Sequence, residues 1–457
     1  MKPRIAVPYF PGSNGDFDAI ERIKESGMGH VPLYFHIGDE ERLMRNASIL
    51  AEEMDGAVLP GGFPYQDRID FGTVPAKIRP FAKALRGLVD KGKPVIAFCS
   101  GNQIAHAMRL AFPSDTDYKA AMLTNICDTG GRIVTYGFLD KELYTRLECS
   151  PERTAFTRHY TPGEIVPGII DHGGGRFWAD AETLRYLLTN GMVVSRYCDN
   201  NGNVIDDFPV NPNGSMLNIE AITNLRGNLK IGMVHNERKI NALYQDRGNL
   251  VFASMREFIE DGCPDLSRHA KPQDIPIELK DYSYLSHEFD PSRTLDIFIK
   301  MLTDDNERTT AQLFLGEGCS IDRRRLLRLE LAEEHMSEER AKEILTEIAQ
   351  MDFFNGIMLK KDLPYVRMPD GRIFAYEVVG KEGGKLIRRF NEYASVVEGF
   401  PVMHEQVGIP NLGGHEVRDV LRGNESLRDA VRHVHTGKAW FFRDEQSKRR
   451  ALEELLG

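Results

Sequence analysis

Apolar runs and amphipathic helical segments alternate along residues 1–110 of this 457-residue chain, and this alternation limits the possible folds more than any other feature. The apolar runs are nearly continuous, as in strands that are buried on both faces. Such strands between helices indicate an α/β domain with a mostly parallel sheet. We expect strands at residues 4–10, 30–36, 56–62 and 94–98, and helices at residues 16–27, 39–54 and 77–92.

The pattern changes at about residue 132. From there to about residue 234, strand-like runs are separated by turns rich in Asn, Gly and Pro, which favour antiparallel additions to the sheet. A closing helix is expected at 249–262. We therefore predict one α/β domain at residues 1–262, followed by a linker at residues 263–294.

The second half of the chain contains a smaller α+β region. Strands are expected at residues 295–302, 325–331 and 356–361, with a helix at 337–350 whose N-cap is Ser337. These elements predict a small α+β unit at 295–362. Residues 363–457 stay unassigned and mixed, with a hairpin at 366–379 and two or three polar helices. The Arg/His-rich stretch at 432–450 is read as a solvated helical face, with a partner surface as the alternative.

Composition and charge exclude several classes of protein. A formal net charge of -10 argues against a nucleic-acid or anionic-membrane partner. No run of about 18 apolar residues is present, so we expect no membrane span, and the N-terminus lacks the apolar core of a signal peptide. The six cysteines are scattered without a CxxC pair, which fits neither a zinc site nor a disulfide framework. We therefore expect a reducing, cytoplasmic setting.

Cys99 is the first candidate catalytic residue. The apolar strand at 95–98 ends on it, and a helical segment follows at once. A sharp strand-to-helix turn exposes the residue at the carboxyl end of the sheet, and the helix N-terminus stabilises a thiolate there. Gly101 leaves room for such a turn. This is the pattern of a nucleophile elbow, and the alternative is an ordinary buried cysteine.

His235 and Glu237 are the candidate partners of Cys99. They follow the apolar run at 231–234 and stand two residues apart, so that the carboxylate can orient the imidazole. The alternative is a surface loop with ordinary charges. Because a cysteine nucleophile needs a base, the combination favours a Cys-His-Glu triad.

The stretch VLPGGFPYQD at residues 58–67 is the third candidate element. Gly61 and Gly62 let the backbone approach a substrate, and their N–H groups can point at a developing oxyanion. The alternative is a plain turn. It is not a phosphate-binding loop, since no Lys-Ser or Lys-Thr follows.

Several motifs in a fixed order resemble one enzyme family. They are PGSN, VLPGGFPYQD, FCSGNQI, DHGGGRFWAD, RYCDNNGN, NPNGSMLNIEAITN and GMVHNER, between residues 11 and 238. Together they resemble the glutaminase component of phosphoribosylformylglycinamidine synthase, a family of class I glutamine amidotransferases in purine biosynthesis. The resemblance covers about the first 260 residues and implies a flavodoxin-like α/β fold.

The resemblance implies roles for individual residues. Cys99 would attack the side-chain amide of glutamine, and His235, oriented by Glu237, would carry the proton. Backbone N–H groups of Gly62 and Ser100 would form the oxyanion hole. The substrate residues implied are Gln103 and, with a structural histidine as the alternative, His172.

The resemblance also implies partners. Because the chain shows neither an ATP-binding motif nor a metal-ligand cluster, we expect it to bind no cofactor, with ATP and Mg²⁺ on a partner synthetase. Residues 295–362 resemble the small subunit that bridges glutaminase and synthetase in bacteria, and a lineage-specific docking module is the alternative.

The sequence departs from the family pattern at several positions. Ala97 and Asn236 replace a glycine and a proline next to the catalytic residues, while Gly15, Pro64 and Gln66 replace other motif residues. None of these changes removes a catalytic atom. Two further function classes therefore stay open, namely the same chemistry serving a different synthetase and a non-catalytic scaffold on this fold.

Overall fold

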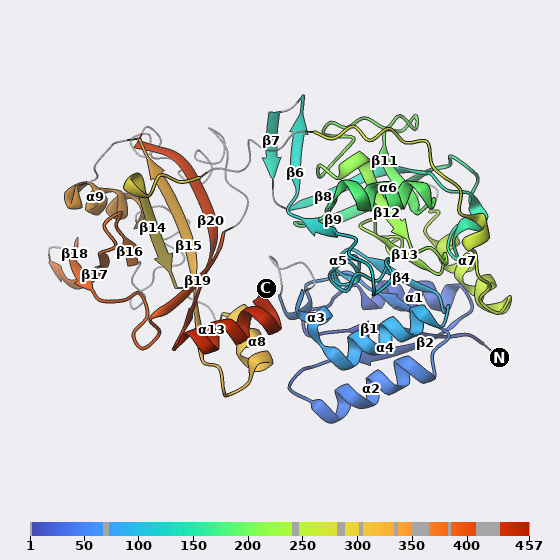
Figure 1. Cartoon of the computed structure of the whole chain (residues 1–457), viewed down its shortest axis with the longest axis horizontal. Helices are drawn as coiled ribbons and strands as arrows, with labels where there is room; N and C mark the ends of the chain where they lie inside the picture. Colours follow the sequence, from blue (N-terminus) through green and yellow to red (C-terminus); the bar gives the residue numbers. More distant parts are fainter. Residues whose placement is uncertain are drawn as a thin grey trace. The chain divides into compact units, whose positions relative to one another are not determined.

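The computed structural model forms two compact units, Met1–Lys280 and Asp281–Gly457 (Figure 1). It describes residues 2–66, 73–130, 132–136, 138–239, 246–280, 288–300, 305–332, 337–349, 365–382, 385–407 and 430–456.

A nine-stranded sheet forms the centre of the first unit, in the order β2-β1-β3-β4-β13-β12-β11-β8-β9. The strands from β2 to β13 in this order are parallel, and the remaining pairs are antiparallel. The mostly parallel sheet and its antiparallel additions are thus confirmed. The strand bounds are β1 Arg4–Tyr9, β2 Gly29–Tyr34, β3 Gly56–Leu59, β4 Val95–Phe98, β8 Leu139–Leu147, β9 Ile165–His172, β11 Val193–Cys198, β12 Ile219–Thr223 and β13 Leu229–Gly232.

Helices cover this sheet. Ile23 of α1 and Phe252 of α7 belong to one buried cluster with Val58 and Phe98 of the sheet, which removes apolar surface from water. The α2 N-cap is Asp39, whose side chain accepts a hydrogen bond from the Arg42 N–H, and α2 begins with two glutamates. The helix bounds are α1 Asp16–Glu25, α2 Glu40–Glu52, α3 Thr73–Lys77, α4 Arg79–Asp90, α5 Ser100–Ala107, α6 Ala181–Thr189 and α7 Asn249–Glu260.

Two short strand pairs complete the first unit. They are β5 Ala120–Leu123 with β10 Arg176–Ala179, and β6 Ile126–Thr129 with β7 Arg132–Tyr136, both antiparallel.

The expected linker at 263–294 does not begin where the sequence suggests. Its first part, up to Lys280, packs on the first unit. The side chain of Gln273 hydrogen-bonds both the N–H and the carbonyl of Val193, and Lys280 pairs with Asp128 and Asp207. These long-range contacts anchor a segment that has turn-like composition.

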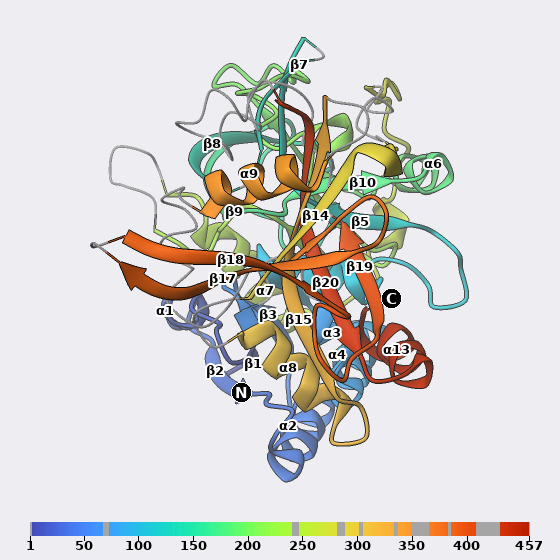
Figure 2. The ribbon, with the colours of Figure 1, turned by 90° about the vertical axis from the view of Figure 1, so that its left-hand side faces the viewer.

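The second unit is built on a seven-stranded sheet, in the order β18-β17-β16-β14-β15-β20-β19. Ala341 and Ile344 of α9 pack on one face of it, where Figure 2 shows this helix lying across the sheet. The predicted strands at 295–302 and 325–331 and the helix at 337–350 are present. The bounds are β14 Thr294–Ile299, β15 Ile321–Leu331, β16 Tyr365–Arg367, β17 Ile373–Glu382, β18 Lys385–Tyr393, β19 Val402–Val407, β20 Val431–Phe442, α8 Asn306–Leu315, α9 Glu338–Ala349 and α13 Glu445–Ala451.

The C-terminal stretch at 432–450 differs from its expected form. Most of it is β20, which lies between β15 and β19, and the helix α13 follows only at residue 445. Trp440 and Phe442 are buried, and the buried Lys438 pairs with Glu307. The charges that suggest a solvated helix are therefore partly neutralised inside the unit. Residues 295–362 and 363–457 share one sheet instead of forming separate regions.

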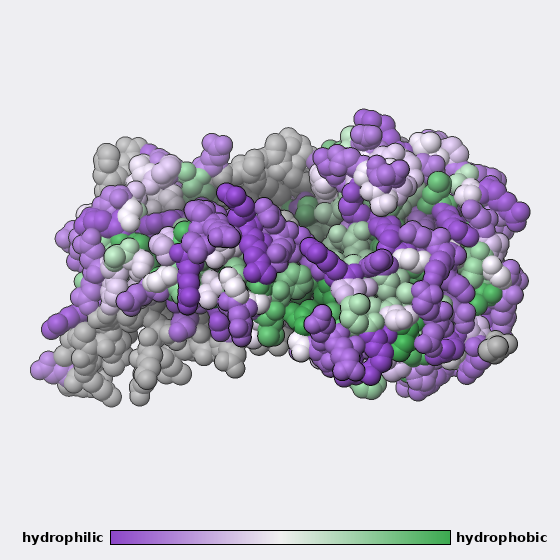
Figure 3. All heavy atoms as spheres, turned by 60° about the horizontal axis from the view of Figure 1, so that its bottom comes forward, coloured by the Kyte–Doolittle hydropathy of each residue, from purple (hydrophilic) through white to green (hydrophobic). Residues whose placement is uncertain are grey.

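The expected strand at 356–361 lies outside the described residues. In the part of the chain that the structure describes, no helix is both long and apolar enough to cross a membrane. The face shown in Figure 3 is mostly hydrophilic with smaller apolar areas, and exposed large apolar side chains include Phe17 and Phe138.

Candidate active site

Cys99 lies at the sharp turn between β4 and α5. Its backbone has a φ of 48° and a ψ of -110°, a conformation that a residue with a side chain rarely adopts. Strain of this kind persists where the surrounding structure enforces it, and it is common at functional sites. The Cys99 N–H donates to the carbonyl of Gly232 in β13, which fixes the turn against the neighbouring strand. The predicted elbow geometry is present.

Two glycines make room for this turn. A Cβ atom at Gly101 would overlap the carbonyl oxygen of Leu59. A Cβ atom at Gly61 would lie 2.6 Å from Cε1 of His235 and 3.4 Å from Cβ of Cys99. Gly61 is therefore in contact with both the cysteine and the histidine, and larger residues would push them apart.

His235 and Glu237 form a buried hydrogen-bonded pair. Nδ1 of His235 lies 2.6 Å from Oε1 of Glu237, and each residue is 1% exposed. The segment that carries them begins three residues after β13 ends, at the carboxyl edge of the sheet that also holds Cys99. Among the described residues, Nε2 of His235 has no hydrogen-bond partner. The ring is thus held at one nitrogen and free at the other.

The electrostatics of this pair favour a protonated imidazole. Burial alone would lower the pKa of His235, but the carboxylate of Glu237 and the sulfur of Cys99 outweigh it and raise the pKa to about 10. An imidazolium beside a thiolate is the form in which a cysteine acts as a nucleophile.

The candidate oxyanion donors are Gly62, which follows Gly61 in the chain, and Ser100, which follows Cys99. Gly62 has a φ of 134°, which only glycine adopts readily, and it forms an isolated bridge with Ser13. Ser100 is the first residue of α5, and its hydroxyl donates to the carbonyl of Pro60 at 3.4 Å. N–H groups in the first turn of a helix have no acceptor within the helix, so they are available to an anion.

Gln103 and His172 both contact the short loop that follows β9. Nε2 of Gln103 donates to the carbonyl of Gly174 at 2.8 Å. The ring of His172 is packed against Gly175, and neither of its nitrogens has a hydrogen-bond partner among the described residues. Burial, with His235 as a smaller influence, lowers the pKa of His172 to about 3. Its neutral ring is enclosed by protein, as in the structural alternative that the sequence left open.

Several residues at the site were not identified from the sequence. Sγ of Cys99 donates to the carbonyl of Asp171 at 3.4 Å. This contact could not be predicted, because every residue has a backbone carbonyl and the residue type therefore gives no signal. Arg22 of α1, far away in the chain, donates to the carbonyl of Glu237. Lys230 is the one with a recognisable signal, since it is a charged residue directly before the apolar run that leads to His235.

Asp67, part of the motif at 58–67, lies outside the described residues. Within the described part of the chain, no group of three or more His, Cys, Asp or Glu side chains is arranged to hold a metal ion. All six cysteines are free, and Cys99 differs from the others in standing next to a histidine–carboxylate pair.

Comparison with known proteins gives one family. The model of the CobB/CobQ-like glutamine amidotransferase domain matches residues 2–250. The phosphoribosylformylglycinamidine synthase subunit PurQ of Methanocaldococcus jannaschii is 34% identical over 256 residues, which are 56% of this chain and 98% of that protein. The subunit of the same name from Methanothrix thermoacetophila is 34% identical over 269 residues, with the same shares covered.

Solved structures also show similarity to part of the chain. The structure of PurLQS from Thermotoga maritima contains a chain that is 27% identical, with a TM-score of 0.43, covering 57% of this chain and 100% of its own length. The glutaminase domain of a Trypanosoma brucei protein described as CTPS, with bound acivicin, is 15% identical with a TM-score of 0.37, covering 61% of this chain and 98% of its own length.

Proposed function

Because the chain belongs to the CobB/CobQ-like glutamine amidotransferase family, we propose that it is the glutaminase subunit of a phosphoribosylformylglycinamidine synthase. In this role it hydrolyses glutamine to glutamate and supplies the ammonia to a synthetase in purine biosynthesis. The relatives that carry this name match over nearly their whole length, which supports the assignment of the first unit.

One observation carries the chemistry of the proposal. His235 is held by Glu237 at Nδ1, while Nε2 has no partner among the described residues and Cys99 is close enough to raise the pKa of the ring. A nucleophile, a base and a group that orients the base are the three parts of such a relay.

The first half of the reaction forms a thioester. The Cys99 thiolate attacks the side-chain carbonyl carbon of glutamine, and the carbonyl oxygen becomes an oxyanion. His235 gives its Nε2 proton to the leaving nitrogen, the C–N bond breaks, and ammonia departs. The N–H groups of Gly62 and Ser100 bind the oxyanion, and each donor of this kind is worth about 2.7–4 kcal/mol in comparable enzymes.

The second half restores the enzyme. His235, now neutral, takes a proton from a water molecule that attacks the thioester carbon. The C–S bond breaks, glutamate leaves, and Cys99 and His235 return to the thiolate and imidazolium. Glu237 keeps Nδ1 protonated throughout, so that Nε2 is always the nitrogen that exchanges protons.

The ATP-dependent step belongs to a partner in this proposal. The synthetase binds ATP and Mg²⁺, and this chain contributes glutamine chemistry without a cofactor, in the cytoplasm. We further propose that residues 295–362 serve as the bridging subunit does in bacteria. The pattern of that subunit is strand, helix, strand, acidic helix and strand. The order β14, α8, β15, α9 supports the first four elements, and the expected last strand at 356–361 lies outside the described residues.

A labelling experiment tests the nucleophile. The glutamine analogue diazo-oxo-norleucine should alkylate Cys99 and leave the other five cysteines unmodified, as read by peptide mass spectrometry. Cys99→Ala should abolish both labelling and glutamine hydrolysis while the protein stays folded. Labelling at Cys127 or Cys198 instead would refute the assignment of Cys99.

A further inference from the structure

Three buried charged residues that the proposed reaction does not use lie around the segment Val234–Arg238. They are Arg22 in α1, Glu220 in β12 and Lys230 in β13, and each is less than 9% exposed. Charged groups in such places are costly unless they are paired or hydrogen-bonded. Their common neighbour is the short segment that carries His235 and Glu237.

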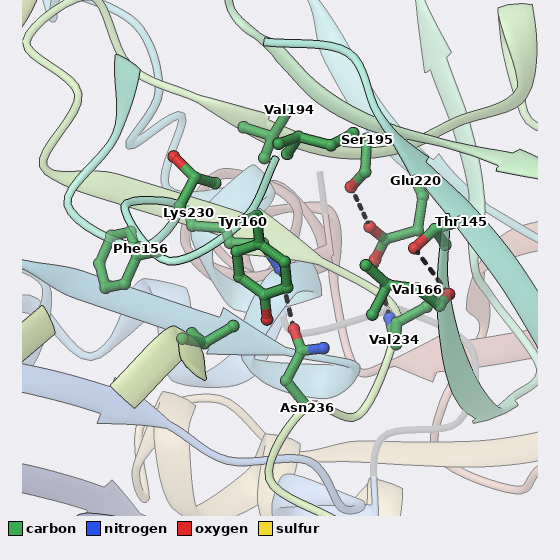
Figure 4. Close-up of a pocket in the computed structure, with 13 residues that line it drawn as sticks. Thr145, Phe156, Tyr160, Val166, Val194, Ser195, Glu220, Lys230, Val234 and Asn236 are labelled. Atoms are coloured by element: carbon green, nitrogen blue, oxygen red, sulfur yellow. Dashed lines mark hydrogen bonds between the residues drawn. The ribbon is translucent and has the colours of Figure 1, made fainter. Parts of the chain in front are cut away.

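Lys230 contacts this segment at its centre. Nζ of Lys230 donates a hydrogen bond to Oδ1 of Asn236 at 3.0 Å, the contact that Figure 4 shows between the two labelled side chains. Asn236 stands between His235 and Glu237 in the chain. The side chain of Lys230 therefore holds the one residue that separates the two members of the pair.

Glu220 holds the residue before His235. Its Oε1 accepts a hydrogen bond from the N–H of Val234 at 2.9 Å, while Oε2 accepts from the hydroxyl of Ser195 at 2.6 Å. Both carboxylate oxygens are thus engaged. Because the Ser195 contact fixes the Glu220 side chain, the backbone entering His235 is attached to the sheet.

Arg22 holds the residues after the pair. Its Nε donates to the carbonyl of Glu237 at 3.1 Å, and one terminal nitrogen donates to the carbonyl of Arg238 at 3.0 Å and to Asp246 at 2.6 Å. The catalytic segment is thus bound before His235, between His235 and Glu237, and after Glu237.

Packing alone does not immobilise Asn236. A cavity of about 30 Å³, enough for a water molecule, lies beside it and is lined by Lys230, Glu220, Val234 and Tyr160, among others. Figure 4 shows these side chains around the open space. Asn236 could move into this space if its side chain were released. The hydrogen bond from Lys230 therefore holds the Asn236 side chain in its observed position beside this space.

We propose that Lys230 and Asn236 are a positioning pair that fixes the spacing and orientation of His235 and Glu237. This inference rests on the proposed function, because it assigns the pair a role in that proton relay. Neither residue donates or accepts a proton in the reaction. Their role is to keep the Nδ1–Oε1 contact formed while Nε2 exchanges protons, and displacements of about 1 Å in such a relay can cost about 10²-fold in rate.

The charges around Lys230 are consistent with this role. Burial lowers the pKa of Lys230, while the carboxylates of Glu220 and Glu237 favour its charged form. The ammonium group is thus stabilised by two carboxylates, that of Glu220 in β12 and that of Glu237 within the segment that it holds. Cys149 and Tyr160 are further titratable groups near Lys230. Burial raises the pKa of the Cys149 thiol to about 12 and also raises the pKa of Tyr160, so both stay neutral.

The test uses Lys230→Met, Asn236→Ala and the double variant, with the exposed Lys91→Met as a matched control. The first readout is the rate at which iodoacetamide alkylates Cys99 between pH 5 and 10. Loss of the positioning pair moves His235 away from Cys99, so alkylation at pH 7 should slow by about tenfold or more. Lys91→Met should retain the wild-type profile.

The second readout is synthetase-activated glutaminase activity. Each single variant should lower kcat by roughly 10- to 100-fold with KM within about twofold, since neither side chain belongs to the proposed substrate contacts. The double variant should lose no more than the worse single variant, because the two residues act through one hydrogen bond. Asn236→Asp keeps an acceptor oxygen and should stay within about threefold of wild type.

Clear outcomes would overturn the inference. Wild-type alkylation profiles in both folded single variants would do so, and so would losses that multiply fully in the double variant. If Lys230→Met fails to fold, the result for Asn236→Ala alone tests the inference. This variant deletes the acceptor of the same hydrogen bond, at a position that lies beside a cavity. The alkylation profile does not require glutamine turnover. Slowed alkylation in a protein that never hydrolyses glutamine would therefore refute the proposed function and leave the positioning pair intact.

Discussion

The imidazole of His235 lies directly against the backbone of Gly61. A Cβ atom on Gly61 would stand 2.6 Å from Cε1 of the ring, closer than real Cβ contacts come. The ring cannot give way easily, because its other side is held by Glu237 at 2.6 Å. The smallest side chain at residue 61 therefore disturbs the relay without removing any catalytic atom.

Gly61→Ala should thus reduce glutamine hydrolysis by about 10²-fold or more, because it displaces His235 from Cys99. The loss of folding free energy should stay near 1–3 kcal/mol, the usual range for a local overlap. Gly87→Ala in α4 is the matched control, since its Cβ would meet nothing within 4 Å. It should retain full activity and gain about 0.5–1 kcal/mol in stability. Steady-state kinetics measure the activity of the two variants, and urea unfolding measures their stability. Full activity in Gly61→Ala would contradict the described contact.

The members of the relay should differ in how much they contribute. His235→Ala removes the proton carrier and should lower kcat by about 10³-fold or more, close to the loss in Cys99→Ala, because parts of one relay fail together. Glu237→Gln keeps a hydrogen-bonding side chain but removes the charge, so its loss should be smaller, about 10²-fold. The exposed His159→Ala serves as the control and should be fully active. High activity in His235→Ala would mean that another base acts, and His172 would be tested next.

Two buried histidines should make the first unit sensitive to acid. Burial lowers the pKa of His106 to about 4 and, together with His235, lowers the pKa of His172 to about 3. An unfolded histidine titrates near 6.5. Between these values the unfolded chain binds protons that the folded chain does not, so stability falls as pH falls from about 6.5. Each histidine contributes up to about 1.4 kcal/mol per pH unit.

His235 acts in the opposite direction. Its raised pKa of about 10 gives stability that is fully present below about 6.5 and is lost as pH rises through 10. His235 therefore contributes nothing to the acid slope, that is, to the fall in folding stability between pH 7 and pH 5. Urea unfolding between pH 7 and 5 measures this slope, and a Trp440→Phe background leaves Trp178 as the reporter of the first unit. His106→Gln and His172→Gln should flatten the slope, whereas His159→Gln should not. An unchanged slope in both buried-site variants would contradict the argument.

The local chemistry of the site was predictable because it depends on short-range pattern. A strand that ends on Cys99 before a helix can form only a sharp turn, and the structure has that turn. His235 and Glu237 are two residues apart, so their contact needs no knowledge of the rest of the fold. The parallel sheet follows in the same way from buried strands that alternate with helices.

The supporting contacts were not predictable, because they join distant parts of the chain. Arg22 meets Glu237 across more than 200 residues, and nothing in its helix distinguishes it from a surface arginine. Asn236 is noticeable as a departure from the resembling family, but only the structure supplies Lys230 as its partner. The strand β20 was misread because Lys438 and its neighbours look solvated until Glu307 and a neighbouring strand cover them.

The final prediction concerns the division of the chain at Lys280. The relatives match only the first 56% of the chain, and the first unit has its own buried core, so residues 1–280 should fold alone. A chain ending at residue 262 should be less stable, because it lacks the contacts of Gln273 with Val193 and of Lys280 with Asp128.

If the second unit serves as the bridge to the synthetase, the 1–280 protein should keep its basal glutaminase activity but lose most activation by the synthetase with ATP and acceptor. A coupling free energy of about 1–3 kcal/mol corresponds to roughly 5–150-fold activation of the full-length protein. Ammonia release, measured for both proteins with and without the synthetase, tests this. Equal activation of both would show that the second unit is not the bridge. If the synthetase activates neither protein, although both hydrolyse glutamine at the basal rate through Cys99 and His235, a different synthetase receives the ammonia.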